Sequence, residues 1–223
     1  MIRLVAFDVA GTTVSDEGLV LRAFRQAFEV AVPDLWALKS AEFTRYAIDT
    51  MGQSKIEVFT AMLGELELAE SANREFEAAY LDLIQREGVV EIPGASEVFA
   101  ELKSRGVLIG LTTGFSRETL DAILASLDWH SFIDASAVPG DVGAGRPSPL
   151  MLQKLAQDLK VYPDETVVLG DTQSDMIAGA EFGAAEVIGV LTGTHSQIEL
   201  LNAGAQNVLE SIRTLPNYLF NRN

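Results

Sequence analysis

Residues 3–14 place an acidic side chain at the end of an apolar run, and this feature constrains the fold most. The run reaches Asp8, and the chain then turns through Ala10-Gly11. A continuous apolar run that ends in a turn is typical of a strand buried in a parallel sheet. Ligands of open α/β sheets bind beyond the carboxyl ends of the strands, so we expect Asp8 at the mouth of a cleft. An Asp that only stabilises the turn is the alternative for this motif alone.

The rest of the chain divides into two patterns. Over residues 17–87, apolar residues recur at helical spacing between polar breaks such as Val32-Pro33-Asp34. From residue 92 onward, strand and helix patterns alternate, which predicts a parallel, doubly wound, Rossmann-like sheet. We therefore predict an α/β fold with a core domain of residues 1–16 and 88–223 and an inserted helical cap domain of residues 17–87.

The predicted core elements follow from these patterns. After the first strand, the predicted strands cover residues 107–111, 133–138, 166–169, 185–190 and 207–209, and the predicted helices cover residues 95–105, 116–127, 149–159, 174–182 and 196–202. Ser116 is expected to cap its helix. The residues from Pro216 onward give no usable signal.

Charge and composition exclude several classes of protein. The formal net charge of −16 argues against nucleic acid or an anionic membrane as a partner, so an anionic substrate needs a locally positive pocket. The chain has no Cys, which excludes a thiolate nucleophile and a Cys-bound metal and fits a reducing cytoplasm. The sequence shows neither a signal-peptide pattern nor a membrane span, so we expect a cytoplasmic protein.

Two further strand ends carry groups that suit an anion. Thr112 and Thr113 offer hydroxyls, and the amides of Thr113 and Gly114 precede a helix, where a phosphate is favoured. Arg146 lies in a glycine-rich loop and presents a planar fork that matches phosphate oxygens. Taken singly, a Thr pair is usually a turn and a lone Arg is usually a surface charge.

Another strand end carries two acids, Asp171 and Asp175, and carboxylate oxygens are ligands that Mg²⁺ prefers. Taken alone, Asp-x-x-x-Asp is usually the start of a helix. The chain order of acid, hydroxyl, cation and acid pair, each after a strand, is hard to obtain from structural needs alone. It therefore indicates one functional site.

This order of motifs resembles the haloacid dehalogenase superfamily of hydrolases over essentially the whole chain. The resemblance implies a nucleophilic aspartate, a hydroxyl motif, a basic motif and an acidic motif at Asp8, Thr112, Arg146, and Asp171 with Asp175.

Two departures from the common pattern are similar to one branch of that superfamily. Most members carry a second Asp where this chain has Ala10, and a Lys where it has Arg146. Asp-x-Ala-Gly-Thr together with an Arg resembles the phosphonatase branch, which phosphonoacetaldehyde hydrolases typify. A C–P bond has no leaving oxygen to protonate, so the second Asp is not needed for its cleavage.

The same branch implies a cap lysine that forms a Schiff base with the substrate aldehyde, and Lys55 lies at its position in the motif of residues 51–56. Ser54 and Glu57 form a capping-box pattern, which predicts a helix that begins at Lys55. The positive end of the helix dipole disfavours the ammonium, and Schiff-base formation needs the neutral amine. The alternative is a solvated Lys on the cap surface.

The resemblance implies Mg²⁺ held by Asp8, the Ala10 carbonyl and Asp171, with Asp175 orienting ligands and water rather than binding the metal. It implies a small-molecule phosphonate or phosphate as the partner, and a homodimer formed through the caps. The Phe24/Phe28 stripe suits such a contact or the interior of the cap equally.

The phosphonate oxygens are expected to contact Thr112, Thr113, Gly114 and Arg146. Gly11 is expected to permit the tight turn after the nucleophile. In the implied reaction, the lysine condenses with the aldehyde, the nucleophilic aspartate attacks phosphorus, and the carbon leaves as an enamine.

Three positions depart from the branch: Val58, Phe115 and Gly18 lie where its members tend to have His, Tyr and Cys. They leave the nucleophile intact and leave a related phosphonate or phospho-aldehyde open as the substrate. A Mg²⁺-dependent phosphomonoesterase and a degenerate binding module inactivated by Ala10 are further alternatives. His130 and His195 are isolated, and neither is assigned a role.

Overall fold

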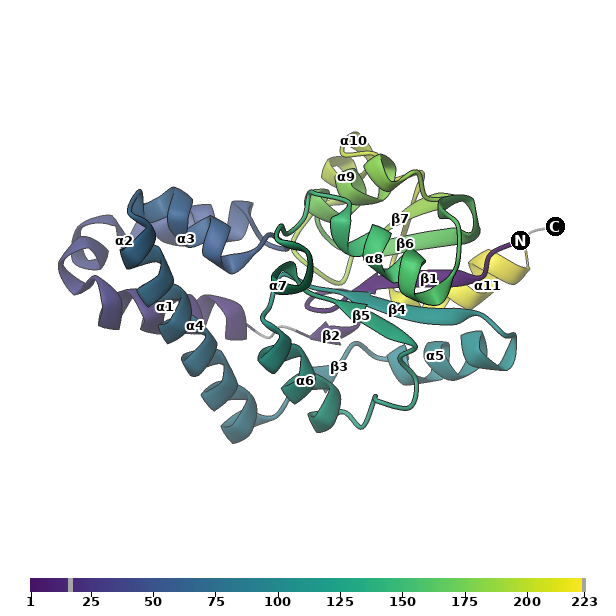
Figure 1. The fold of residues 1–223 in the computed structure, drawn as a ribbon, viewed down its shortest axis with the longest axis horizontal. Helices are drawn as coiled ribbons and strands as arrows, with labels where there is room; N and C mark the ends of the chain where they lie inside the picture. Colours follow the sequence, from purple (N-terminus) through teal and green to yellow (C-terminus); the bar gives the residue numbers. More distant parts are fainter. Residues whose placement is uncertain (16–17, 222–223) are drawn as a thin grey trace.

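The sheet has six parallel strands in the order β5-β4-β1-β6-β7-β8, as the predicted doubly wound fold requires (Figure 1). The structure, a computed structural model, describes residues 1–15 and 18–221. The strands are β1 (Leu4–Asp8), β4 (Leu108–Thr112), β5 (Ala135–Ala137), β6 (Thr166–Gly170), β7 (Glu186–Val190) and β8 (Asn207–Leu209). The strand order reverses at β1, so ligands are expected at the carboxyl end of this strand.

Strand β1 is buried on both faces, which explains its uninterrupted apolar run. Leu4 and Ala6 pack on one face against α8 (Leu150–Leu159) and α9 (Gln173–Phe182). Phe7 packs on the other face, where its ring centroid lies 5.3 Å from that of Phe99 in α5 (Ala95–Ser104). Alternate side chains of β1 therefore pack against the helical layers on the two faces of the sheet, and Asp8 lies at the edge of the sheet where the strand ends.

The remaining core elements are α6 (Arg117–Ser126), α7 (Pro139–Val142), α10 (Gln197–Asn202), α11 (Leu215–Phe220), and the 3₁₀ turns η1 (Pro163–Glu165) and η2 (Ile212–Thr214). The predicted core strands and helices are all present within two residues of their expected bounds. Ser116 caps α6 as predicted, because its side chain accepts a hydrogen bond from the Thr119 amide. The sequence prediction missed α7 and α11.

Four helices lie together at one end of the molecule, away from most of the sheet (Figure 1). They are α1 (Leu19–Ala31), α2 (Pro33–Asp49), α3 (Lys55–Leu63) and α4 (Leu66–Glu87). Phe24, Phe28, Phe59 and Phe76 form the buried aromatic interior of this group. The Phe24/Phe28 stripe is therefore cap interior rather than a surface open to a second copy.

A short antiparallel ribbon joins the two passages between the sheet and these helices. It consists of β2 (Val14–Ser15) and β3 (Val90–Glu91). The predicted bounds of the core and cap stay a prediction, and residues 16 and 17 lie outside the described residues. No helix in the described part of the chain combines the length and the apolar character that a membrane crossing requires.

Candidate active site

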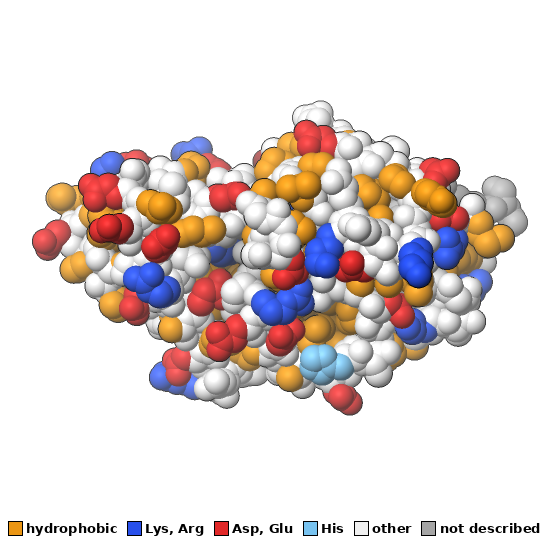
Figure 2. Space-filling model, viewed as in Figure 1, with side chains coloured by type: hydrophobic (Ala, Val, Ile, Leu, Met, Phe, Trp, Pro, Cys, Tyr) orange, Lys and Arg blue, Asp and Glu red, His pale blue; other side chains and the backbone are white. Residues whose placement is uncertain are grey.

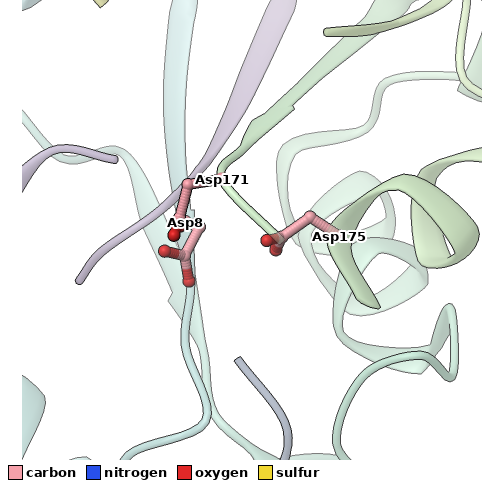
Figure 3. A group of neighbouring side chains, drawn as sticks. All are labelled: Asp8, Asp171 and Asp175. Carbon is pink, nitrogen blue, oxygen red and sulfur yellow. The ribbon is translucent and has the colours of Figure 1, made fainter. Parts of the chain in front are cut away.

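Three buried carboxylates meet at the carboxyl edge of the sheet. Asp8 ends β1, Asp171 follows β6, and Asp175 lies in the first turn of α9. Figure 3 shows the carboxylates of Asp8 and Asp171 close together and Asp175 pointing toward them from its helix. One ligand atom from each lies within 4.8 Å of the others. Because β1 and β6 are paired in parallel, their following residues must arrive at the same edge.

Asp171 has a pKa well above the ordinary value of an aspartate. Burial and the neighbouring charge of Asp8 raise the pKa of Asp171 to about 7, although two hydrogen-bond donors and one positive charge oppose the shift. The Thr12 hydroxyl donates to one carboxylate oxygen and the Thr194 amide donates to the other, both at 3.0 Å. Arg146 opposes the shift through its charge. A buried acid pair with this residual repulsion fits a divalent cation.

Close backbone approach shapes the space around Asp171. Gly11 has a φ of +88°, and a Cβ added there would lie 2.6 Å from a carboxylate oxygen of Asp171. A Cβ added at Gly193 would lie 1.8 Å from that oxygen. The Thr192 hydroxyl donates to the Gly11 carbonyl at 2.7 Å and ties the loop after β7 to the turn after β1. Gly11 thus has a role beyond the expected tight turn.

Arg146 is the buried cation of the cluster and is only 2% exposed. One terminal guanidinium nitrogen lies 2.6 Å from an Asp8 oxygen, and the other pairs with Asp175. Asp175 also accepts hydrogen bonds from the Thr172 amide at 3.0 Å and the Thr172 hydroxyl at 2.6 Å. These contacts fix the Asp175 carboxylate beside the other two acids, and the positioning role that the resemblance implies for it stays a prediction.

The hydroxyl motif also reaches this edge. Thr112 ends β4 directly opposite Asp8 in the β1–β4 register and is 4% exposed. Thr113 and Gly114 follow it and line a small cavity together with Asp8 and Arg146. The cavity has a volume of about 20 Å³, which is room for roughly one water molecule.

Lys55 reaches the same cavity from the cap. It is the first residue of α3, is 5% exposed, and lines the cavity with Asp8 and Ala10. Its Nζ lies 5.8 Å from the ring centroids of both Phe24 and Phe115 and donates to the Gln53 carbonyl at 3.4 Å. The alternative of a solvated lysine on the cap surface is therefore wrong.

The capping box expected at Lys55 is also wrong. The helix begins at Lys55, but the Ser54 side chain makes no capping hydrogen bond within the described residues. Glu57 instead accepts a hydrogen bond from the Gly145 amide of the core at 3.4 Å. Ser54 is buried against Gly145, so both residues of the predicted capping box contact the core instead of capping the helix.

The three unusual positions have ordinary packing environments. Val58 is 2% exposed in the cap interior, and Gly18 precedes α1 with a φ of +79°. Phe115 lines the cavity and packs on Tyr80 with ring centroids 4.7 Å apart. His130 is exposed, and His195 follows Thr194 in the loop over Asp171.

Sequence reasoning missed Thr12 and the loop of residues 192–194. Both contact Asp171 or its neighbour Gly11. A usable signal existed for the loop, because Thr192-Gly193-Thr194 follows a predicted strand whose end must reach the same edge of the sheet.

Comparison with known proteins identifies the family of the chain. A model of the haloacid dehalogenase-like hydrolase family matches residues 2–183. The phosphonoacetaldehyde hydrolase of Bacillus mycoides strain KBAB4 is 33% identical over 223 residues, which cover 93% of this chain and 82% of that protein. The phosphonoacetaldehyde hydrolase of Bacillus cereus strain AH820 is 32% identical over 240 residues, covering 97% and 87%.

Solved structures show the same fold. A hydrolase from Pseudomonas syringae superposes with a TM-score of 0.84 at 24% identity, covering 98% of each chain. A phosphonoacetaldehyde hydrolase like protein from Oleispira antarctica gives a TM-score of 0.80 at 22% identity, covering 99% of this chain and 92% of that one.

The doubly wound parallel sheet and the acid cluster at its carboxyl edge define an α/β protein of Rossmann-like fold. The chain belongs to the haloacid dehalogenase-like hydrolases.

Proposed function

We propose that this hydrolase cleaves the C–P bond of phosphonoacetaldehyde or a related phosphonate through a Schiff base on Lys55 and a phosphorylated Asp8. One observation carries the proposal: a buried lysine of the cap and a buried aspartate of β1 line the same small cavity. The relatives named phosphonoacetaldehyde hydrolase, at 33% and 32% identity, support it.

The chemistry of each cavity residue suggests whether it would contact the phosphonate or the metal ion. Arg146 offers a fixed fork of donors to the phosphonate oxygens, and the Thr113 and Gly114 backbone lies at the same cavity. Asp8, the Ala10 carbonyl and Asp171 are the oxygen donors that would hold Mg²⁺. When bound, Mg²⁺ supplies positive charge that offsets the repulsion between the phosphonate and the carboxylates.

The reaction balances without a redox partner. The Lys55 amine condenses with the aldehyde and releases water, which gives an iminium ion. Asp8 attacks phosphorus, and the electrons of the C–P bond move into the iminium to form an enamine. Water then cleaves the aspartyl-phosphate, and protonation and hydrolysis of the imine release acetaldehyde. The net reaction is phosphonoacetaldehyde plus water to acetaldehyde plus phosphate.

Trapping with borohydride tests the proposal. We expect borohydride with phosphonoacetaldehyde to leave a reduced adduct on the peptide that contains Lys55, measured by mass spectrometry. Lys55→Arg should abolish the adduct and the release of phosphate, because a guanidinium does not form the imine. Lys39→Arg is the matched control, since Lys39 is an exposed lysine of α2.

Two outcomes would contradict the proposal. Release of phosphate from p-nitrophenyl phosphate that survives Lys55→Ala, without an adduct from the aldehyde, would favour a phosphomonoesterase. Failure to bind Mg²⁺ and to form any phosphoenzyme would favour a binding module. Asp8→Ala should abolish turnover under the proposed function, and retained turnover would exclude Asp8 as the nucleophile.

A further inference from the structure

A second, larger cleft lies next to the small cavity between the cap and the core. Its volume is about 390 Å³, and its lining includes Asn73 and Glu77 of α4 and Arg117 and Asp141 of the core. Lys55 lines both spaces, as do Gly114 and Phe115. Lys55 is therefore shared between the small cavity and the larger cleft.

The two spaces differ in what they can hold. The small cavity, at about 20 Å³, has room for roughly one water molecule. The larger cleft falls within the range of roughly 300–1,000 Å³ that is usual for sites of small organic ligands. A substrate that places its phosphonate near Asp8 and its carbonyl carbon at Lys55 has further room beside it in the larger cleft, which shares Lys55 with the small cavity.

The polar groups of the larger cleft are mostly matched to one another. Glu77 accepts hydrogen bonds from the Ser116 hydroxyl at 2.6 Å and from the Thr119 hydroxyl. Arg117 donates to Asp141. Figure 2 shows acidic and basic side chains gathered on this face over α6 and α7, where the core meets the cap.

Asn73 is the exception among these groups. Its side-chain oxygen is buried and has no hydrogen-bond partner within residues 1–15 and 18–221. A buried acceptor without a donor is costly, so this oxygen favours a ligand that brings a hydroxyl or ammonium hydrogen.

We propose that the larger cleft receives a hydroxylated substituent on the carbonyl carbon, so that the preferred substrate class is hydroxylated β-keto phosphonates, with hydroxyacetonylphosphonate as the smallest example. This inference rests on the proposed function. A ketone carries a second substituent where an aldehyde carries hydrogen, and that substituent would extend past Lys55 toward Asn73. The hydroxyl would donate to the Asn73 oxygen.

The reaction follows the same electron flow. Lys55 condenses with the ketone and releases water, Asp8 takes the phosphoryl group, and the C–P electrons enter the iminium. Hydrolysis of the aspartyl-phosphate and of the imine gives hydroxyacetone and phosphate. One water molecule is consumed overall.

Three phosphonates test the inference in one assay of phosphate release: hydroxyacetonylphosphonate, acetonylphosphonate and phosphonoacetaldehyde. The first two differ only by the hydroxyl. We expect kcat/KM for the hydroxylated ketone to exceed that for acetonylphosphonate by about tenfold, the worth of one neutral hydrogen bond. Asn73→Leu should bring this ratio close to one, and Asn73→Ser should lower it less.

Asn202→Leu, at an exposed position of α10, is the matched control and should keep the ratio of the wild type. A ratio of two kcat/KM values does not depend on the fraction of folded enzyme, so partial misfolding of a variant does not obscure the result.

The outcomes separate the two proposals. Cleavage of phosphonoacetaldehyde with no preference for the hydroxylated ketone, or a preference that Asn73→Leu leaves intact, would overturn the inference and leave the proposed function standing. If no phosphonate is cleaved and borohydride traps no adduct, the proposed function falls and the inference with it.

Discussion

Arg146 holds two acids of the site in place at the scale of single residues. It is buried between Asp8 and Asp175 and pairs with both. Two buried carboxylates without this cation would each carry an uncompensated charge. The ion pairs therefore link the stability of the fold to the position of the Asp8 carboxylate.

Arg146→Ala should lower the free energy of unfolding by about 3–5 kcal/mol, because breaking a buried pair leaves its partner charged and unsolvated. Urea titration measures this change. Arg25→Ala is the control: Arg25 pairs with Glu29 on the surface, with 68% and 42% of the two side chains exposed. That variant should lose less than about 1 kcal/mol. Equal losses would contradict the buried role of Arg146.

Asp171 gives the site a dependence on pH that can be measured without substrate. The folded state raises the pKa of Asp171 from 3.8 to about 7, so the folded protein holds a proton that the unfolded chain releases. The resulting stability is fully present below pH 3.8 and is lost as pH rises through about 7.

In EDTA, the free energy of unfolding should therefore fall as pH rises from about 5 to 7, by up to about 1.4 kcal/mol per pH unit. Asp171→Asn should flatten this fall, and Asp164→Asn, at an exposed acid of η1, should not. Urea unfolding at several pH values measures both slopes. An unchanged slope in Asp171→Asn would assign the effect to another group.

At the scale of elements, the first turn of α3 is fitted closely to the core. A Cβ added at Gly114 would lie 2.3 Å from the Gln53 carbonyl oxygen, and one added at Gly145 would lie 2.6 Å from the Ser54 Cβ. The segment that carries Lys55 thus reaches the cavity because two core positions lack side chains.

Gly114→Ala should push residues 50–54 away from the core, because the contact it creates is with backbone atoms that have no rotamer to change. Hydrogen exchange at the amides of these residues should then be faster than in the wild type. Gly140→Ala is the control, since a Cβ there meets nothing within 4 Å. Unchanged protection in Gly114→Ala would show that the cap segment adapts without opening.

The elements that could be predicted are those whose apolar pattern extends over several residues. Strand β1 is one example, because all five of its residues are buried. The ribbon of β2 and β3 has two residues per strand, which is too short for any periodicity to appear. Helix α11 was missed because its sequence, Leu215–Phe220, is six residues long and contains Pro216 and an Asn.

The candidate site was predictable to the same extent. Strand ends placed Asp8, Thr112 and Asp171 at one edge because parallel register leaves no other choice. The pairing of Arg146 with both Asp8 and Asp175 was not predictable, because a loop has no register. The role of Ser54 was predicted wrongly because a local capping pattern competes with tertiary contacts that a sequence does not show.

At the scale of the whole molecule, the proposed function requires an acidic protein to accept an anionic substrate. The formal net charge is −16, so repulsion within the folded chain is substantial and added cations of any kind should stabilise it. A specific site for Mg²⁺ at the acid cluster would add stabilisation beyond this general screening.

We expect MgCl₂ to raise the Tm more than NaCl does at the same ionic strength, because only Mg²⁺ would bind the oxygens of Asp8 and Asp171. Differential scanning fluorimetry measures the difference. Asp171→Asn should remove the excess, whereas Asp164→Asn should keep it. Equal shifts with the two salts would contradict a specific magnesium site.

The ribbon of Val14–Ser15 and Val90–Glu91 ties both ends of the cap to the same place on the core. A cap that opens would therefore rotate about this ribbon as a single hinge, rather than slide along the core or detach from it. Because Lys55 belongs to the cap and Asp8 to the core, each rotation would separate these two side chains and would also open the contact between Tyr80 of the cap and Phe115 of the core.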